Sequence, residues 1–372
     1  MNVKICHIST AHTRYDVRIF LKEATSLAEL SSLFSVSLLI ADDYPDEVRN
    51  GVSIKSIGKP KSRIERMFTA SKKILKKAKK EDADIYHIHD PELFWLIIPL
   101  KAAKKKVIFD LHEDLPAQIL SKPYLNSISR KLLYWVAKLY EGFLFNKADY
   151  IVTATPFICD INRKRNQNII CVSNFPIQAE FRNDATVDLN LKELSVCYTG
   201  GISTIRGVGF LIDSVLQSDS DWILHLAGPI GDRLIEEKLN DALSKTNRIK
   251  YWGNVDRVTL KKIFSISRAG FVTFLPVPNH TNAVPNKLFE YMSSGLPVIC
   301  SSFKYWEEII SENNVGLVVD PSNISEIIRS VEYIMKNKDE AIEWGRNGVL
   351  AVKNKYNWEA EREKLINVYK RF

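Results

Sequence analysis

Short apolar runs of the kind found in fully buried β-strands alternate with helix-type segments along nearly all of this 372-residue chain. Strands that are apolar throughout, separated by segments with the helical period, are typical of a parallel sheet with helices on both faces. The sequence therefore predicts an α/β protein. The expected strands are Val3–Ser9, Ser35–Ala41, Ile85–His89, Val107–Leu111, Tyr150–Thr155, Ile169–Ser173, Val196–Thr199, Trp222–Ala227, Ile249–Trp252, Gly270–Leu275, Pro297–Ser301 and Gly316–Val319.

A break in this alternation divides the chain. At Ser173–Asn190 the pattern lapses into Ser-Asn-Phe-Pro-Ile and a polar stretch, which we interpret as a linker. Because a chain of this length exceeds the usual size of one core, we predict two doubly wound, Rossmann-like domains at residues 1–175 and 190–352. A last segment, residues 353–372, contains an expected helix with an apolar stripe that should pack against another element.

Composition and the distribution of apolar residues exclude several classes of protein. The longest apolar run, Phe94–Leu100, is far shorter than the ~20 residues of a membrane-spanning helix. The apolar stretch at the N-terminus is short and broken by polar residues, so we predict a first strand, no signal peptide and a cytoplasmic protein. The five cysteines are scattered singly, which disfavours a disulfide framework or a structural zinc site.

Positive charge is concentrated in one segment. The formal net charge is +8, and residues 59–80 carry eight Lys, two Arg and one Glu, so the rest of the chain is close to neutral. Ile64, Met67 and Phe68 within this segment belong to a pattern with helical spacing, and Ser129–Phe145 is a second amphipathic, aromatic-rich stretch. A solvated basic face and docking on an anionic membrane surface both remain open. Nucleic acid is disfavoured because no aromatic residues interleave with the lysines.

The segment Pro285-Asn-Lys-Leu-Phe-Glu-Tyr-Met-Ser-Ser-Gly-Leu-Pro-Val-Ile predicts a short helix that follows a strand and a Pro-rich loop. The unpaired amides of such a helix N-terminus favour a phosphate. Lys287 places a positive charge in the first turn, where the helix dipole favours an anion, so a bound anion would explain it. Glu290 lies on the same face and can accept hydroxyl groups of a ribose. The structural alternative is a core helix with Lys287 and Glu290 as an exposed pair.

A second segment, Tyr198-Thr-Gly-Gly-Ile-Ser-Thr-Ile-Arg-Gly, runs from a strand through glycines into an expected helix with Arg206 in its first turn. Arg206 and Lys287 would come from separate turns at one edge of one sheet, where both could flank a diphosphate. In the first domain, Ala11-His-Thr-Arg-Tyr-Asp-Val-Arg follows the first strand, His87-Ile-His-Asp-Pro-Glu ends another, and Asp110-Leu-His-Glu-Asp ends a third. An ion-pair network among Arg14, Asp16 and Arg18 is the structural alternative for the first of these.

These segments together resemble retaining glycosyltransferase family 4 (glycosyl transferases group 1), in the variant with Pro-x-Lys-x-x-Glu-Tyr-Met-x-x-Gly-x-Pro-Val-Ile. The resemblance implies a GT-B fold, with an acceptor-side first domain and a donor-side second domain facing across a cleft. It implies transfer of a hexosyl unit from a UDP- or GDP-sugar to a hydroxyl of a glycan or a polyprenyl-diphosphate-linked acceptor, as in polysaccharide, O-antigen or capsule biosynthesis. Trp358 and Tyr369 resemble the family's last helix, which returns to the first domain.

The resemblance also assigns residues on the donor side. Glu290 matches the glutamate that holds the nucleotide ribose, while Lys287 and Arg206 match the cations near the diphosphate. The family's usual second glutamate is Asn282 here, so the contact to the donor sugar differs. The full set of donor-side residues is Gly201, Arg206, Asn254, Val255, Asn282, Ala283, Val284, Lys287 and Glu290.

His112 matches the family histidine near the donor sugar and the reacting centre, with Asp16 and Glu113 as its companions. The polar residues assigned to the acceptor are His12, Arg14, Arg18 and His89.

No metal or other cofactor is expected. Asp82-Ala-Asp84 has the spelling of a metal-binding Asp-x-Asp, but it precedes its strand instead of following it. His87, His89, Asp90 and His112 could be imagined as ligands, yet no fixed spacing supports a metal site. Two other functions remain open: a sugar-nucleotide epimerase with the same fold, which would convert the donor alone, and a non-catalytic sugar-nucleotide-binding subunit, which would not hydrolyse it.

Overall fold

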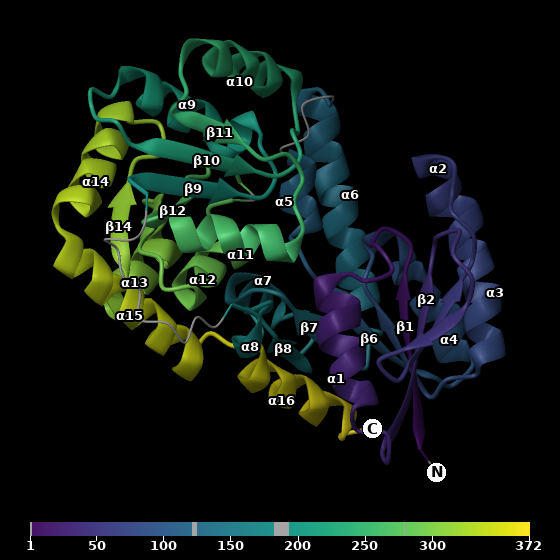
Figure 1. The fold of residues 1–372 in the computed structure, drawn as a ribbon. Helices are drawn as coiled ribbons and strands as arrows, with labels where there is room; N and C mark the ends of the chain where they lie inside the picture. The colour runs from purple at the N-terminus through teal and green to yellow at the C-terminus, as the bar shows by residue number, and fades with distance from the viewer. Residues whose placement is uncertain (1, 121–124, 182–192, 279) are drawn as a thin grey trace. The chain divides into compact units, whose positions relative to one another are not determined.

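The structure is a computed structural model that describes residues 2–120, 125–181, 193–278 and 280–372 (Figure 1). It divides into two compact units. The N-terminal unit comprises Met1–Asn174 and Trp358–Phe372, and the C-terminal unit comprises Phe175–Asn357. The N-terminal unit thus takes its last helix from the far end of the chain. The predicted linker, Ser173–Asn190, extends into residues 182–192, which lie outside the described residues.

The N-terminal unit is built on an eight-stranded sheet with the order β3-β4-β2-β1-β5-β6-β7-β8. Its neighbouring strands pair in parallel, except for β3 with β4. The order reverses between β1 and β5, so the carboxyl ends of these two strands border the place where doubly wound sheets bind ligands. The strands are β1 (Val3–Ser9), β2 (Phe34–Ile40), β3 (Glu47–Arg49), β4 (Val52–Ser56), β5 (Ile85–Ile88), β6 (Lys106–Leu111), β7 (Tyr150–Thr153) and β8 (Ile169–Cys171).

The antiparallel pair β3–β4 was missed by the sequence analysis. It is a hairpin around Asn50 and Gly51, whose φ angles are +50° and +76°. Both residues adopt the left-handed conformation that a tight two-residue hairpin turn requires. Asn-Gly is the strongest short-range sequence signal for such a turn. The signal was therefore present in the sequence, but the short, polar flanking segments lacked a strand pattern.

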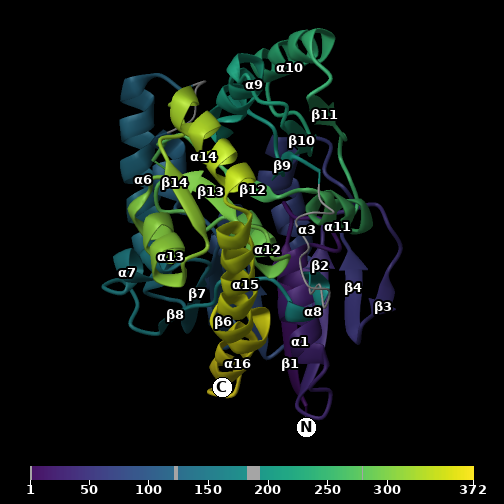
Figure 2. The same ribbon diagram turned by 60° about the vertical axis from the view of Figure 1, so that its left-hand side comes forward.

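Helices cover the sheet of the N-terminal unit, and one of them comes from the C-terminal end of the chain. They are η1 (Val17–Ala24), α1 (Thr25–Ala28), α2 (Arg63–Glu65), η2 (Arg66–Ala70), α3 (Ser71–Glu81), η3 (Pro91–Leu96), α4 (Ile97–Ala102), α5 (Leu115–Leu120), α6 (Ser127–Phe145), α7 (Pro156–Asn162) and α16 (Trp358–Tyr369). Figures 1 and 2 show α16 beside α1. The indole nitrogen of Trp358 donates to Oγ of Ser26 at 3.0 Å, and Leu365 and Tyr369 are fully buried. The apolar stripe predicted for the last helix therefore packs within this unit.

The C-terminal unit contains a six-stranded parallel sheet with the order β11-β10-β9-β12-β13-β14. Its order reverses between β9 and β12. The strands are β9 (Ser195–Thr199), β10 (Ile223–Ala227), β11 (Ile249–Tyr251), β12 (Ala269–Val272), β13 (Val298–Ser301) and β14 (Gly316–Val319). The helices are α8 (Gln178–Phe181), η4 (Thr204–Arg206), α9 (Val208–Gln217), α10 (Arg233–Lys245), α11 (Arg257–Ile266), α12 (Asn286–Ser293), α13 (Lys304–Asn313), α14 (Ile324–Lys336) and α15 (Lys338–Asn354).

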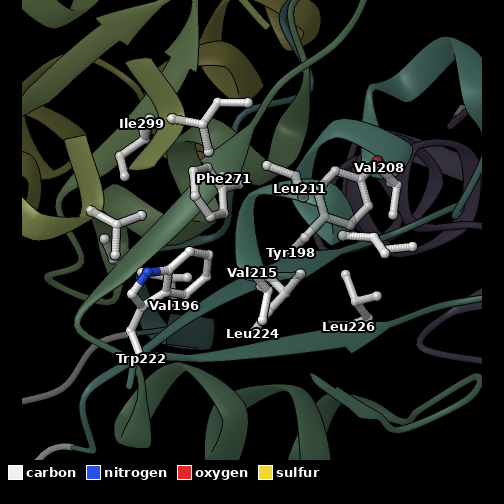
Figure 3. Close-up of a cluster of buried hydrophobic side chains, with 14 of the residues drawn as sticks. Val196, Tyr198, Val208, Leu211, Val215, Trp222, Leu224, Leu226, Phe271 and Ile299 are labelled. Atoms are coloured by element: carbon white, nitrogen blue, oxygen red, sulfur yellow. The ribbon is translucent and has the colours of Figure 1, made fainter. Parts of the chain in front are cut away.

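Each face of this second sheet has its own core. Figure 3 shows one of them, where Tyr198 and Phe271 from the sheet lie among apolar side chains that include Leu211 and Val215 from α9. The core on the other face gathers residues from α11, α12 and α13 against β12 and β13. Both faces are apolar, which explains why these strands have no alternation of polar and apolar residues.

Gly270 in β12 holds the donor-side helix α12 close to the sheet. A Cβ at Gly270 would lie 2.7 Å or less from three ring atoms of Tyr291, a fully buried residue of α12. We expect Gly270→Ala to lower the free energy of unfolding by about 1–3 kcal/mol, because the ring and the helix must move away. Urea denaturation measures this.

The matched control is Gly142→Ala in α6. A Cβ there meets no atom within 4 Å, and the residue is helical. Alanine should stabilise the helix by about 0.5–1 kcal/mol relative to glycine. Equal stabilities of the two variants would contradict the close approach at Gly270.

Candidate functional site

A glycine turn after β9 brings two cations together. Gly200 has a φ of +106°, a conformation that residues with a side chain rarely adopt. A Cβ at this position would lie 3.3 Å from Nζ of Lys287 and 3.6 Å from Nη1 of Arg206. At Gly201 it would lie 3.2 Å from the same Nη1. The two glycines therefore leave the space in which the cations lie over one turn.

Lys287 is buried without a hydrogen-bond partner for its amine among the described residues. Its side chain is 7% exposed. The Nζ lies 3.6 Å from the centroid of the Tyr198 ring and 5.1 Å from that of Phe274, so aromatic faces form its surroundings. Burial and the nearby charge of Arg206 lower the pKa of Lys287 well below its usual range. An anion bound beside the two cations would reverse this shift.

The first turn of α12 contributes to the same place. Pro285 is its N-cap, and no side chain among the described residues caps the helix. The first amide groups of α12 therefore add a partial positive charge to that of Lys287. Arg206 differs from its predicted location: it ends the short turn η4, and α9 begins only after Gly207, whose φ is +72°.

Glu290 follows Lys287 on α12 and is held by an arginine. Nη1 of Arg257 lies 2.9 Å from Oε1 of Glu290, and Nε of Arg257 lies 2.8 Å from Oε1 of Glu180. The Glu290 side chain remains 15% exposed. Sequence analysis missed Arg257, because nothing in a single sequence indicates that the first residue of α11 faces α12.

The other residues assigned to the donor are spread more widely. Asn254 is exposed and Val255 half-buried. The carbonyl of Ala283 accepts a hydrogen bond from the indole of Trp306 at 2.7 Å, and Val284 packs against the core. Asn282 is exposed and lines a cavity of about 480 Å³ together with Pro276, Thr281, Ser302, Phe303, Lys304, Asp320 and Pro321.

In the N-terminal unit, Asp90 organises the loop that follows β1. Its carboxylate accepts hydrogen bonds from the backbone N–H groups of Thr10 and Ala11 and from the hydroxyl of Ser9. This places His12 at the end of β1, with its Nδ1 3.2 Å from Asp16. The side chains of His12 and Asp16 are 30% and 25% exposed. Asp16 also accepts from the first amides of η1, so it caps that helix, and the pKa of Asp16 is lowered to about 2 by His12 and these amides despite its burial.

The two arginines assigned to the acceptor are buried in structural networks. Nε and Nη2 of Arg14 donate to Asp42 at 2.7 and 2.8 Å, and its Nη1 lies 2.9 Å from Glu47. Arg18 donates to both oxygens of Asp110 at 2.8 Å. Both arginines are 4% exposed. The structure therefore favours the ion-pair alternative for both, with partners other than Asp16.

Asp110, at the end of β6, joins the predicted histidines. Its Oδ2 lies 2.9 Å from Nε2 of His112 and 3.2 Å from Nδ1 of His89. The His112 side chain is 19% exposed, whereas His89 is buried and cannot meet an acceptor directly. Glu113 is exposed. His112, His12 and Asp16 are partly exposed at this edge, and a ligand could reach them as well as Glu113.

Two family models match the chain. One, described as Glycosyl transferases group 1, covers residues 181–350, and the other, described as Glycosyltransferase Family 4, covers residues 15–175. The chain belongs to glycosyltransferase family 4. Its curated relatives include the uncharacterized glycosyltransferase MJ1069 of Methanocaldococcus jannaschii, 20% identical over 75% of this chain and 71% of the relative. MJ1178 of the same organism is 24% identical over 52% of this chain and 56% of the relative.

Solved glycosyltransferases share the fold. Sucrose-phosphate synthase from Thermosynechococcus elongatus superposes with a TM-score of 0.78 at 16% identity, over 100% of this chain and 99% of that one. Anabaena HepE in complex with UDP and glucose superposes with a TM-score of 0.76 at 12% identity, over 100% of both chains. At these identities the similarity shows the fold, and it confirms the predicted GT-B class.

Three residues that contact this buried polar network were not predicted to do so by the sequence: His7 in β1, Glu23 in η1 and Tyr369 in α16. Nδ1 of His7 lies 2.9 Å from Nε2 of His89, Glu23 lies 3.1 Å from Nε of Arg18, and the Tyr369 hydroxyl lies 2.7 Å from Nδ1 of His87. Glu23 offered a signal, because a carboxylate within an apolar helical pattern requires a partner when buried. The partners themselves come from distant segments, which the sequence does not connect.

We expect Lys287→Met to stabilise the unliganded glycosyltransferase and to weaken anion binding. An unpaired buried polar group costs about 1–3 kcal/mol, and methionine keeps the volume. The pKa of Lys287 is lower in the folded state than in the unfolded chain, so between these two pKa values the unfolded state binds more protons. The free energy of unfolding of the parent should therefore rise with pH across this range, up to about pH 10.4, the pKa of lysine in an unfolded chain. The stability gap between parent and variant should therefore narrow at higher pH.

Thermal unfolding with and without pyrophosphate measures both effects. Pyrophosphate should raise the melting temperature of the parent and of the control Lys262→Met, which removes an exposed lysine of α11, but not that of Lys287→Met. A less stable Lys287→Met variant that pyrophosphate still stabilises would contradict the assignment.

Proposed function

We propose that this protein is a retaining hexosyltransferase that uses a UDP- or GDP-sugar and a glycan or polyprenyl-diphosphate-linked acceptor in surface-polysaccharide biosynthesis. The observation that carries the donor class is the convergence of Arg206 and the unpaired Lys287 over the Gly200–Gly201 turn. The solved complex of HepE with UDP and glucose supports the same class of ligand.

The chemistry follows from where charge develops. As the bond from the anomeric carbon to the diphosphate breaks, negative charge grows on the diphosphate, and Arg206, Lys287 and the first amides of α12 stabilise it. The acceptor oxygen forms its bond on the same face of the sugar, and its proton passes to an oxygen of the leaving diphosphate. Because the cations are side chains, we propose that this step requires no divalent metal ion.

The N-terminal unit is assigned to the sugar and the acceptor. His112, His12 and Asp16 are its partly exposed polar side chains at the end of β1 and β6. Asp110 accepts from Nε2 of His112, which leaves Nδ1 as the nitrogen that can accept a hydrogen bond from a ligand. These residues would orient the sugar and the acceptor hydroxyl.

Binding of UDP compared with pyrophosphate separates the roles of Lys287 and Glu290. Glu290→Ala should weaken UDP binding about 10- to 100-fold through the loss of ribose contacts, corresponding to about 1.5–3 kcal/mol, and should leave pyrophosphate binding unchanged. Lys287→Met should weaken both. Isothermal titration calorimetry gives the dissociation constants.

Glu308→Ala, which removes an exposed carboxylate from α13, is the matched control and should bind both ligands as the parent does. If Glu290→Ala binds UDP and GDP with parental affinity, the ribose assignment fails.

We further propose that the N-terminal unit docks on an anionic membrane surface. No helix within the described residues is long and apolar enough to cross a bilayer. Phe68 on η2 and Leu132 and Leu139 on α6 are nevertheless at least 63% exposed. A cavity of about 890 Å³ is lined by side chains that include Phe68 of η2, Tyr140 of α6 and Lys72 of α3. Exposed apolar residues beside exposed lysines match the acyl chains and charged headgroups of an anionic bilayer.

Replacing Lys72, Lys73, Lys76 and Lys79 by Gln should abolish cosedimentation with anionic vesicles. Each basic residue near such a surface contributes about 1 kcal/mol. These four lysines are exposed, whereas Nζ of Lys77 donates to the carbonyl of Ser56 at 2.6 Å. Binding by the parent should fall at high salt and be absent on neutral vesicles.

The control removes the same charge from the C-terminal unit: Lys245, Lys250, Lys261 and Lys262 to Gln. It should cosediment like the parent. Retention of binding by the first variant, or equal loss by both, would contradict docking through α3.

A further inference from the structure

Three histidines and a glutamate form a closed group inside the N-terminal unit. We call His7, Glu23, His87 and His89 the histidine cluster. Each of the four offers one ligand atom such that all four atoms lie within 4.8 Å of one another, and all four residues are at most 1% exposed. They come from β1, η1 and the end of β5, where β1 and β5 pair His7 directly with His87.

The cluster contains polar atoms that the protein leaves unpaired. Neither carboxylate oxygen of Glu23 has a hydrogen-bond partner among the described residues, and neither has Nε2 of His87. A buried polar atom without a partner costs about 1–3 kcal/mol, and more if charged. Oε1 of Glu23 lies 3.1 Å from Nε of Arg18, so Oε2 of Glu23 and Nε2 of His87 are the atoms at which a further partner would fit.

The balance of charge points to a cation. Glu23 and Asp110 are two buried carboxylates, and both lie against one guanidinium: Nε of Arg18 is 3.1 Å from Glu23 and its Nη2 is 2.8 Å from Asp110.

The surroundings of His89 are those of a metal ligand. Its Nδ1 lies 3.2 Å from Asp110, while its Nε2 lies 2.9 Å from Nδ1 of His7 and 4.0 Å from Glu23. Histidine ligands typically donate their second ring N–H to a carboxylate in this way, which fixes the ring and its tautomer. Asp110 is itself held by both arms of Arg18, so the orienting carboxylate is rigid.

The distances suit a small tetrahedral ion. Zn–N bonds of about 2.0–2.1 Å in a tetrahedral site place ligand atoms roughly 3.4 Å apart. Nδ1 of His7 lies 2.9 Å from Nε2 of His89, and this Nε2 lies 4.0 Å from Oε2 of Glu23. Nδ1 of His87 lies 3.7 Å from the same Oε2 and would have to exchange its contact with the Tyr369 hydroxyl, at 2.7 Å, for the ion. Side-chain shifts of well under about 1 Å would bring all three pairs to that spacing.

We propose that the histidine cluster binds one structural Zn²⁺ ion through His7, His87, His89 and Glu23. Three imidazoles and one carboxylate are a ligand set that suits zinc. With no exposed ligand and no open position, the ion would join β1, η1 and β5 instead of taking part in the transfer reaction. The proposal revises the sequence-based expectation of no metal, it is independent of the proposed function, and it leaves the metal-free donor chemistry unchanged because the residues differ.

Metal content of the full-length protein tests the proposal. The protein is exposed to zinc, desalted and analysed by inductively coupled plasma mass spectrometry, and we expect about one zinc per chain. Stripping the ion with a chelator should lower the melting temperature, and zinc should restore it, because a ligand that binds only the folded state stabilises it. Less than a tenth of an equivalent of zinc in folded protein, before and after loading, would overturn the proposal and indicate that a proton neutralises Glu23 instead.

Variants locate the ion. Glu23→Gln and His87→Gln should each reduce the zinc content to background, whereas His225→Gln, which removes a buried histidine from the C-terminal unit, should retain it. His112→Gln distinguishes a second possible group, His89 with Asp110 and His112. Loss of zinc in His112→Gln but not in Glu23→Gln would place the ion there and contradict the assignment. If the cluster variants fail to fold, the measurement on the parent protein still decides.

Discussion

The pair between Arg18 and Asp110 is the interaction on which the N-terminal unit depends most. Both side chains are buried, and each of the two hydrogen bonds is 2.8 Å long. Nη1 of Arg18 also donates to the carbonyl of Val172, so one guanidinium connects η1 with the end of β6 and the residue after β8. Breaking such a pair leaves a buried charge and typically costs about 3–5 kcal/mol. Asp110 in turn orients His89 and His112, and the polar edge of the sheet is therefore built outward from this pair.

The C-terminal unit differs because its buried cation has no such hydrogen-bond partners among the described residues. Arg18 has its partners within the fold, whereas Lys287 has no hydrogen-bond partner among the described residues and lies beside a second cation, Arg206. An unpaired buried amine lowers stability, and such a feature persists where a ligand supplies the missing partner. Arg18 therefore has a structural role, whereas Lys287 lacks a hydrogen-bond partner that an anionic ligand could supply.

Periodicity predicted most of the fold, but it predicted much less of the site. All twelve expected strands are present to within a few residues, because buried parallel strands leave a strong apolar signal. Lys287 and Arg206 were predicted from local features: glycines, a helix start and a cation in its first turn. The partners of Arg14 and Arg18 were not, since Asp42 and Asp110 come from other strands. Which strands are neighbours, and in which register, is set by long-range packing that a single sequence does not display.

The same limit explains why the histidine cluster could not be seen in the sequence. The strand pattern placed His7 and His87 on strands, but only the register that pairs them, and the path of η1 that brings Glu23 between them, turns separate residues into a group. Residues 82 positions apart, His7 and His89, lie within 2.9 Å through one ring nitrogen each. A buried polar group of this kind stabilises a fold only when every member is satisfied. One guanidinium, that of Arg18, lies against both Glu23 and Asp110, so the cluster depends on how the second carboxyl group is neutralised.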